Sequence, residues 1–295
     1  MTIALIIICI LLVASVTMAV RLTIQVRRQR QLREEAEASK QQALAEQKRN
    51  QQLKQEMTSN IAHELKTPVS SIRGFLEILL GDKPLDDQQR RYFLERCYSQ
   101  TLRLSDLIAD VALINKLEEA NDLFEMEPVS VNECAEEAIV ELAHQASQHN
   151  ITIHNTLPAG MEIEGDRSLI YTVFRNLIEN AITHAGDGSE VTVDSYQPAD
   201  GERYYLRVCD NGRGVSSEYL PKLFDRFVRI DEGRSRKNGG TGLGLSIVKH
   251  AVQLHGGTVY AKNRPEPKVG DRQGSQPSVS GGLEVLFSLK LKGKN

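Results

Sequence analysis

The segment IAHELKTP, residues 61–68, places an imidazole, a carboxylate and a hydroxyl group within one short stretch of chain. His63 could ligate a metal, attack an electrophile, or be an ordinary exposed helix residue. The HExxH pattern of metalloproteases fails, because Thr67 stands where the second histidine would be. Attack by a neutral ring needs one nitrogen protonated and the other free, and Glu64 could hold Nδ1–H and leave Nε2 to react. These residue types permit nucleophilic catalysis if the chain also supplies an activated group.

Two glycine-rich segments lie in the C-terminal half of the chain. DNGRGV, residues 210–215, follows an expected strand, and its glycines allow a tight turn and close approach of a ligand, although in isolation the hexamer favours a plain β-turn. GGTGLGLSIVKH, residues 239–250, sets glycines before an apolar helix start, where unpaired N–H groups and the helix dipole favour phosphate. This second segment lacks the GK[ST] of a P-loop, so each signal is weak by itself.

A third segment, FRNLIENAITHA at residues 174–185, reads as an amphipathic helix. Asn176 and Asn180 are four residues apart and therefore share one helix face. They could be surface amides, but a carboxamide oxygen is also a suitable ligand for Mg²⁺.

In their order and spacing, HELKTP, NLIEN, DNGRGV, LFDRF and GGTGLGLSIVKH resemble the membrane-bound sensor histidine kinases of two-component systems. The resemblance covers about Met57 to Leu291. It implies a dimerisation and phosphotransfer hairpin, followed by a Bergerat-type ATP-binding domain of the histidine kinase and Hsp90-like ATPase kind.

The resemblance also assigns roles in an ATP site. Asn176 and Asn180 form its asparagine box, with Asn180 as the Mg²⁺ ligand. Asp210 accepts a hydrogen bond from the adenine amino group, while Gly212 and Gly214 flank the base and sugar.

The remaining site residues belong to a lid, which begins at LFDRF, residues 223–227, and at Arg229. The residues expected to close over the phosphates are Gly240, Thr241, Gly242, Leu243 and Gly244. This chain departs from similar proteins at Thr183 and His184, where a basic and an aromatic residue are frequent, so a lysine contact to phosphate is not assumed.

Together these assignments imply a protein-histidine kinase that uses ATP and Mg²⁺. His63 would attack the γ-phosphoryl group, and Glu64 would orient the ring and take its proton. The phosphoryl group would pass to an aspartate of a separate response regulator, since no receiver-like segment follows in this chain. Thr67, by resemblance, would position water for a phosphatase activity toward that regulator. The alternative is a nonenzymatic membrane scaffold that only binds nucleotide.

Several elements must position these groups. Apolar residues recur at helical spacing between Ile61 and Leu79, GDKP at 81–84 breaks the run, and a second run extends from Phe93 to about Glu119. Residues 57–119 therefore form a helical hairpin, whose exposed apolar stripe favours a homodimeric four-helix bundle. Pro68 is expected to bend or loosen the helix just after the site.

After residue 125 the pattern changes to helices that alternate with β-rich runs. Such runs occur at 151–157, 189–196 and 204–211, and a surface loop at 264–282 separates the final two strands. Residues 125–295 therefore form an α/β sandwich, which is the expected ATP-binding domain.

The N-terminal residues, Thr2 to Val20, carry no charge and are long enough to cross a hydrocarbon core of about 30 Å. Arginines follow from Arg21, which predicts a single-pass anchor in the inner (plasma) membrane with a cytoplasmic catalytic part. A cleaved signal peptide is disfavoured because positive charge does not precede the apolar run. With so few residues before this span, input is expected from the bilayer, a membrane partner or the linker.

Residues 21–56 are rich in helix-forming residues and carry a sparse apolar seam. They form either a weak coiled coil or a solvated linker helix. The whole chain, of 295 residues, has a formal net charge of −3 and four scattered cysteines. This balance gives no support to nucleic-acid binding, and the spacing of the cysteines fits neither a zinc knuckle nor a disulfide framework.

Overall fold

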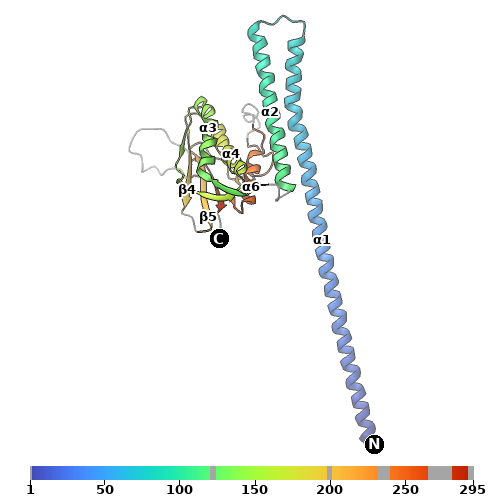
Figure 1. Cartoon of the computed structure of the whole chain (residues 1–295). Helices are drawn as coiled ribbons and strands as arrows, with labels where there is room; N and C mark the ends of the chain where they lie inside the picture. The colour runs from blue at the N-terminus through green and yellow to red at the C-terminus, as the bar shows by residue number, and fades with distance from the viewer. Residues whose placement is uncertain (1, 120–123, 198–200, 231–239, 265–280, 292–295) are drawn as a thin grey trace. The chain divides into compact units, whose positions relative to one another are not determined.

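The computed structural model describes residues 2–119, 124–197, 201–230, 240–264 and 281–291. These fall into two compact units, Met1–Ala62 and His63–Asn295. The helix α1 runs from Thr2 to Leu80, and α2 from Asp87 to Glu119 (Figure 1). The predicted break lies between them at Gly81, and Asp86 caps α2 by accepting the Gln89 N–H at 2.7 Å.

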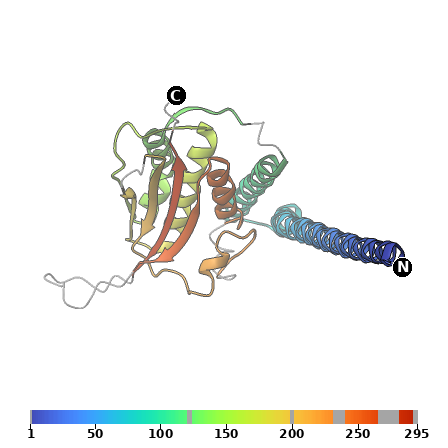
Figure 2. The ribbon, with the colours of Figure 1, turned by 90° about the horizontal axis from the view of Figure 1, so that it is seen from below.

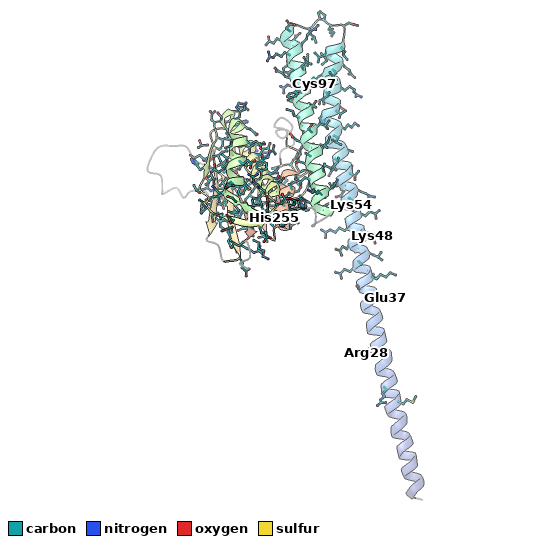
Figure 3. All side chains as sticks on the ribbon, in the orientation of Figure 1. Arg28, Glu37, Lys48, Lys54, Cys97 and His255 are labelled. Atoms are coloured by element: carbon teal, nitrogen blue, oxygen red, sulfur yellow. The ribbon has the colours of Figure 1, made fainter. Side chains whose placement is uncertain are left out.

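In the first unit, the side chains described on α1 are almost all exposed. Figure 3 shows Glu37, Lys48 and Lys54 standing out along this helix. Ala43 and Glu46, which belong to the sparse seam, are exposed, and the neighbouring Leu44 is 48% exposed. The described part of the chain contains no helix that is both long and apolar enough for a membrane span. The predicted span at 2–20 falls almost wholly on side chains outside the described set.

In the second unit, residues from Glu127 onward form the α/β domain. Its elements, in chain order, are β1 (Glu127–Ser130), α3 (Val131–Gln148), β2 (Thr152–Asn155), β3 (Glu162–Gly165), α4 (Arg167–Ala185), β4 (Glu190–Gln197), β5 (Arg203–Asp210), the 3₁₀ turn η2 (Leu220–Lys222), α6 (Gly244–Leu254), β6 (Val259–Asn263) and β7 (Leu283–Lys290). The predicted strands match β2, β4, β5, β6 and β7. The short pair β1 and β3 was not predicted.

Five strands form the main sheet in the order β2-β4-β5-β7-β6. β2 pairs with β4 in parallel, and the remaining pairs are antiparallel. Figure 2 shows the helices α3, α4 and α6 gathered on one face of this sheet. The hairpin and the α/β sandwich expected from the sequence are thereby confirmed.

The central helix α4 explains how the sheet and the helices hold together. Asp166 caps its start by accepting the Leu169 N–H at 3.0 Å. Apolar side chains at helical spacing, from Leu169 to Ile182, are buried along one stripe of the helix. Phe174 lies edge-on to Phe287 of β7, with ring centroids 5.7 Å apart. The buried stripe fixes the rotation of α4, so that its asparagines face the other side.

Candidate active site

Asn176 and Asn180 lie on the half-buried side of α4, as their spacing predicts. The amide nitrogen of Asn176 donates to the Thr172 carbonyl at 2.9 Å, which fixes the side chain. Its Oδ1 lies close to Gly244, where a Cβ would come within 2.4 Å of it. Asn176 therefore meets the start of α6, where free N–H groups favour an anion.

Asp210 ends β5 and is 7% exposed. Its Oδ1 accepts the N–H of Gly212 at 2.8 Å and of Leu283 at 3.2 Å. Burial raises the pKa of this carboxyl group, while the two backbone hydrogen bonds oppose the shift. Oδ2 receives neither of these bonds and is the oxygen suited to an adenine amino group.

Two glycines let the backbone close around Asp210. A Cβ on Gly212 would lie 2.5 Å from the Ala185 carbonyl oxygen, and one on Gly282 would lie 2.1 Å from the Asp210 carbonyl oxygen. Gly214, by contrast, has a φ of 68° and lies against Asn263, whose Oδ1 accepts the Val215 N–H at 2.9 Å. Gly212 thus packs closely on the end of α4, and the predicted place of Gly212 and Gly214 beside the base and sugar stays a prediction.

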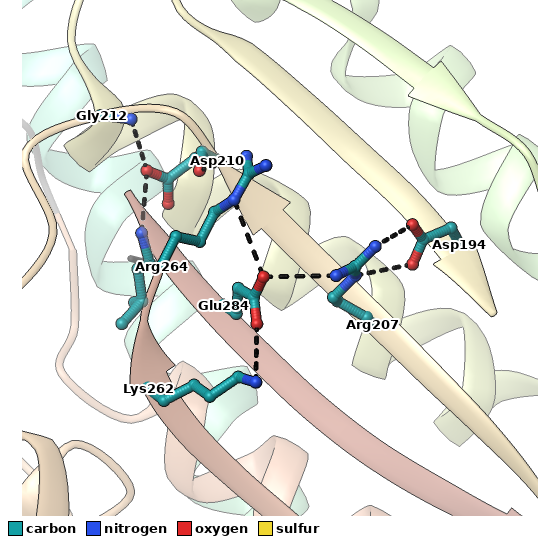
Figure 4. Close-up of polar contacts among 8 residues, drawn as sticks. Asp194, Arg207, Asp210, Gly212, Lys262, Arg264 and Glu284 are labelled. Carbon is teal, nitrogen blue, oxygen red and sulfur yellow. Dashed lines mark hydrogen bonds and ion pairs between the residues drawn. The ribbon is translucent and has the colours of Figure 1, made fainter. Parts of the chain in front are cut away.

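Next to Asp210, an ion network ties the four strands β4, β5, β7 and β6 together (Figure 4). Arg207 binds Asp194 through its Nε at 2.8 Å and also lies 3.2 Å from Glu284. The Glu284 side chain is 7% exposed and also pairs with Lys262 at 3.2 Å and Arg264 at 3.7 Å. The carboxylate of Asp194 raises the pKa of Arg207. This network holds β5 and β7 in register beside Asp210.

The two ends of the predicted lid are held together at their base. The Phe227 N–H donates to the Gly242 carbonyl at 2.8 Å, and Arg229 donates through Nη2 to the Gly240 carbonyl. Gly242 has a φ of 75°, a conformation that suits glycine. Leu243 is fully buried and anchors this end of the lid in the core. The lid residues 231–239 lie outside the described residues.

His63 is exposed on α1, whereas Glu64 is half-buried and turned elsewhere. Glu64 accepts hydrogen bonds from Arg229 at 3.1 and 3.4 Å, and Arg103 of α2 lies 3.6 Å from it. The predicted hydrogen bond from the His63 ring to Glu64 is not among the contacts of this conformation. The catalytic role of Glu64 stays a prediction.

Thr67 is exposed and donates to the His63 carbonyl at 3.3 Å. This bond is an ordinary one within a helix, and its hydroxyl remains beside the solvent. α1 continues through Pro68 without a break, so the predicted hinge stays a prediction. Thr183 likewise donates to the Glu179 carbonyl at 2.8 Å inside its own helix.

Sequence reasoning missed the contacts that join α2 to the lid region. The Thr241 hydroxyl donates to Asp110 at 2.7 Å, and Arg226 forms an ion pair with Glu118. Burial raises the pKa of Asp110. Arg103 and Asp110 share the helical spacing of the buried residues Leu107 and Ile114. Charged residues within an apolar stripe were the signal that could have revealed them.

His255 was also missed, and Figure 3 labels it in the α/β domain. Its Nε2 accepts the Asp166 N–H at 3.0 Å, so Nδ1 carries the proton and donates to the Ala251 carbonyl at 2.7 Å. Burial lowers the pKa of this ring. The neutral ring thereby connects the end of α6 to the cap of α4.

Comparison with known families agrees with this arrangement. Residues 53–120 match the family described as "His Kinase A (phospho-acceptor) domain". Residues 165–293 match the family described as "Histidine kinase-, DNA gyrase B-, and HSP90-like ATPase". A phosphoacceptor hairpin followed by an ATPase domain of this type defines a class of signalling proteins. The chain belongs to the family of two-component sensor histidine kinases.

Individual relatives point the same way. The sensor-like histidine kinase SenX3 of Mycolicibacterium smegmatis is 33% identical over 221 residues, which is 75% of this chain and 57% of SenX3. The sensor histidine kinase WalK of Bacillus subtilis is 32% identical over 218 residues, covering 74% of this chain and 36% of WalK. The chain thus spans little more than half of SenX3 and about a third of WalK.

Among solved structures, histidine kinase ThkA in complex with response regulator protein TrrA is similar in fold. The TM-score is 0.60 at 23% sequence identity, and the match covers 80% of this chain and 61% of that chain. At this identity the likeness supports the fold of hairpin and ATPase domain.

Proposed function

We propose that this protein is an ATP-dependent protein-histidine kinase that phosphorylates itself on His63. The observation that carries the proposal is the match of residues 53–120 to a phosphoacceptor domain, with an exposed His63 inside it. The ATPase domain belongs to the same compact unit, His63–Asn295. Acceptor and nucleotide site are therefore parts of one enzyme.

The chemistry follows from the residue types. Nε2 of the neutral His63 ring attacks the γ-phosphorus of ATP, an N–P bond forms, and the bond to the bridging oxygen breaks to release ADP. Glu64 orients the ring and accepts the Nδ1 proton. The buried Asp210 reads the adenine amino group through Oδ2. Arg229 and Thr241 donate to phosphate oxygens as charge builds there.

Mg²⁺ fits the donors on α4. Asn180 offers a hard carboxamide oxygen on the same helix face as Asn176, whose own Oδ1 lies against Gly244 at the start of α6. We assign Asn180 as the protein ligand, with phosphate oxygens and water as the others. The ion neutralises phosphate charge when bound.

The phosphoryl group on His63 passes to an aspartate of a separate response regulator. ThkA, which is similar in fold, was solved in complex with the response regulator protein TrrA, and His63 is exposed on the hairpin of this chain. Thr67, exposed one turn after His63, positions water for the reverse, phosphatase reaction.

The functional form is a homodimer. Large apolar residues are exposed along the hairpin in this chain: Val69, Leu76, Ile78, Leu94, Tyr98, Leu102 and Ile108. A patch of this extent favours burial against a second copy. Residues 2–20 anchor the dimer in the inner membrane, with the catalytic part in the cytoplasm, as the uncharged segment and the arginines after it predict.

The test uses the full-length chain in detergent with γ-labelled ATP and Mg²⁺. We expect acid-labile label on the wild-type protein and none on His63→Gln. His144→Gln, which changes another exposed histidine, serves as the matched control and should label normally. Equal labelling of His63→Gln would refute the assignment of the acceptor. Nucleotide binding without any label would favour the nonenzymatic scaffold instead.

A further inference from the structure

The guanidinium group of Arg229 donates hydrogen bonds to two partners, Glu64 and the Gly240 carbonyl. Its Nη1 and Nη2 lie 3.4 and 3.1 Å from the two carboxylate oxygens of Glu64, and Nη2 also donates to the Gly240 carbonyl. The Arg229 side chain is 15% exposed and that of Glu64 is 21% exposed. A two-pronged pair in such a partly buried place is screened less than a surface ion pair.

A guanidinium group binds a carboxylate and a phosphate through the same pair of N–H bonds. Arg229 is the lid residue assigned to the phosphates, and its donors are directed to Glu64 in this conformation. The two interactions use the same atoms of Arg229. The carboxylate and the phosphate therefore compete for Arg229.

The local charge favours the arrival of a further anion. Glu64 lies between the guanidinium groups of Arg229 and Arg103, so two positive charges face one carboxylate. Burial and the positive charge of Arg229 lower the pKa of Arg103, which reflects this crowding. A phosphate group would balance the excess, and Arg103 would remain as the partner of Glu64.

The position of Glu64 on the helix shows why its release from Arg229 matters for its assigned role. Consecutive side chains on a helix point in different directions, and His63 is exposed while Glu64 faces α2 and the lid. The pair with Arg229 directs both carboxylate oxygens of Glu64 toward the lid, and no hydrogen bond to the His63 ring is formed in this arrangement. Release from Arg229 lets the Glu64 side chain turn toward the ring, as its assigned role needs.

The opposite end of the lid shows the same pattern. Thr241, also assigned to the phosphates, donates its hydroxyl hydrogen to Asp110 of α2 at 2.7 Å. Both lid residues thus have a hairpin carboxylate as partner. One such contact would be unremarkable, but the pair indicates a resting arrangement in which hairpin carboxylates occupy the phosphate donors.

We propose that nucleotide phosphate and Glu64 compete for Arg229, so that ATP binding frees Glu64 to act on His63. This inference rests on the proposed kinase function. Arg229 binds Glu64 before nucleotide arrives and binds nucleotide phosphate afterwards. Occupation of the nucleotide site thereby determines whether Glu64 is available to act on His63.

The test is a double-mutant cycle on the affinity of the full-length protein for a non-hydrolysable ATP analogue with Mg²⁺. Glu64→Gln removes the competing charge, and we expect about a fivefold gain in affinity. Arg229→Gln should lower the affinity. In the Arg229→Gln background, Glu64→Gln should have no further effect.

Glu77→Gln is the matched control, because Glu77 lies on the same helix and pairs only weakly with Arg73 at 3.7 Å on the surface. It should leave the affinity unchanged. Glu64→Asp keeps the charge on a shorter side chain and should give a smaller gain than Glu64→Gln. Thermal unfolding of each variant verifies that it is folded.

Two results overturn the inference: an unchanged affinity in Glu64→Gln, or an equal gain with and without Arg229. If the wild-type protein binds the analogue and labels His63 but shows either result, the inference alone fails. If the wild-type protein does not bind the analogue, the proposed function fails as well.

Discussion

Asp210, at the predicted adenine end of the site, is held by main-chain groups, whereas Arg229 and Thr241, at the predicted phosphate end, are held by side chains of the hairpin. The first set of contacts depends on strand register and on two close glycines. The second set depends on side-chain pairs that rotamer changes can break. The fold therefore fixes the predicted adenine end, whereas the predicted phosphate donors can exchange their partners.

The buried surroundings strengthen this contrast. Asp210 lies beside the Glu284 network, in which three cations surround one buried carboxylate. Removing one partner of such a buried pair leaves an uncompensated charge, so the network resists rearrangement. Arg229 and Glu64 are partly exposed, and either can find water or phosphate as a new partner.

The largest expected effect is at the adenine end. Asp210→Asn replaces a charged acceptor with an amide that cannot accept from the base and the backbone N–H groups in the same way. We expect the affinity for the ATP analogue to fall about 10- to 100-fold, since a hydrogen bond to a charged group contributes about 1.5–3 kcal/mol. Calorimetric titration measures this loss.

Asp187→Asn is the control for that substitution, because Asp187 is 78% exposed and pairs only with His149. It should bind nucleotide normally. A change of less than about twofold in Asp210→Asn would remove the basis for assigning the adenine end.

A second prediction tests whether close backbone packing builds this end. Gly282→Ala would bring a Cβ to 2.1 Å from the Asp210 carbonyl oxygen, so β7 must shift. We expect a loss of about 1–3 kcal/mol in the free energy of unfolding, together with weaker nucleotide binding. Gly74→Ala, where the added Cβ meets nothing within 4 Å, is the control. Equal melting temperatures for the two variants would contradict the account.

The smallest expected effect is a pH dependence of the free energy of unfolding. It arises at His255, which contacts the cap of α4, the helix that carries Asn176 and Asn180. Burial of the ring lowers the pKa of His255 in the fold, where its Nε2 accepts the Asp166 N–H. The unfolded chain therefore binds a proton more readily, and stability is lost as pH falls from about 6.5 toward the folded pKa.

The slope of this loss approaches at most about 1.4 kcal/mol per pH unit. Thermal unfolding at several pH values measures it, and His255→Gln, which does not titrate, should flatten the dependence. An unaltered slope in that variant would assign the acid sensitivity to other groups.

Much of this fold could be predicted from sequence because its signals are local. Helical spacing marked the hairpin, GDKP marked its turn, and the β-rich runs marked five strands of the main sheet. The strands β1 and β3 were not predicted because each has only four residues, which is too few for a period-two pattern to be distinctive in the sequence. Asn176, Asp210 and the glycines were found through motifs, since their roles depend on type and spacing.

The contacts of Glu64, Asp110 and Arg103 could not be predicted in the same way. Each joins residues far apart in the chain, and a helix face alone does not say what packs against it. Glu64 was expected beside the His63 ring, but a partner 165 residues away holds it in the structure. Only the presence of charge within the apolar stripe of α2 hinted at such contacts.

The most direct test of the contrast between the two ends compares two ligands on one variant. The affinities of adenosine and of the ATP analogue are measured by competition on the wild-type protein and on Glu64→Gln. We expect Glu64→Gln to raise the affinity for the analogue about fivefold and to leave that for adenosine unchanged. An equal change for both ligands, or none for either, would contradict a fixed adenine end and an exchangeable phosphate end.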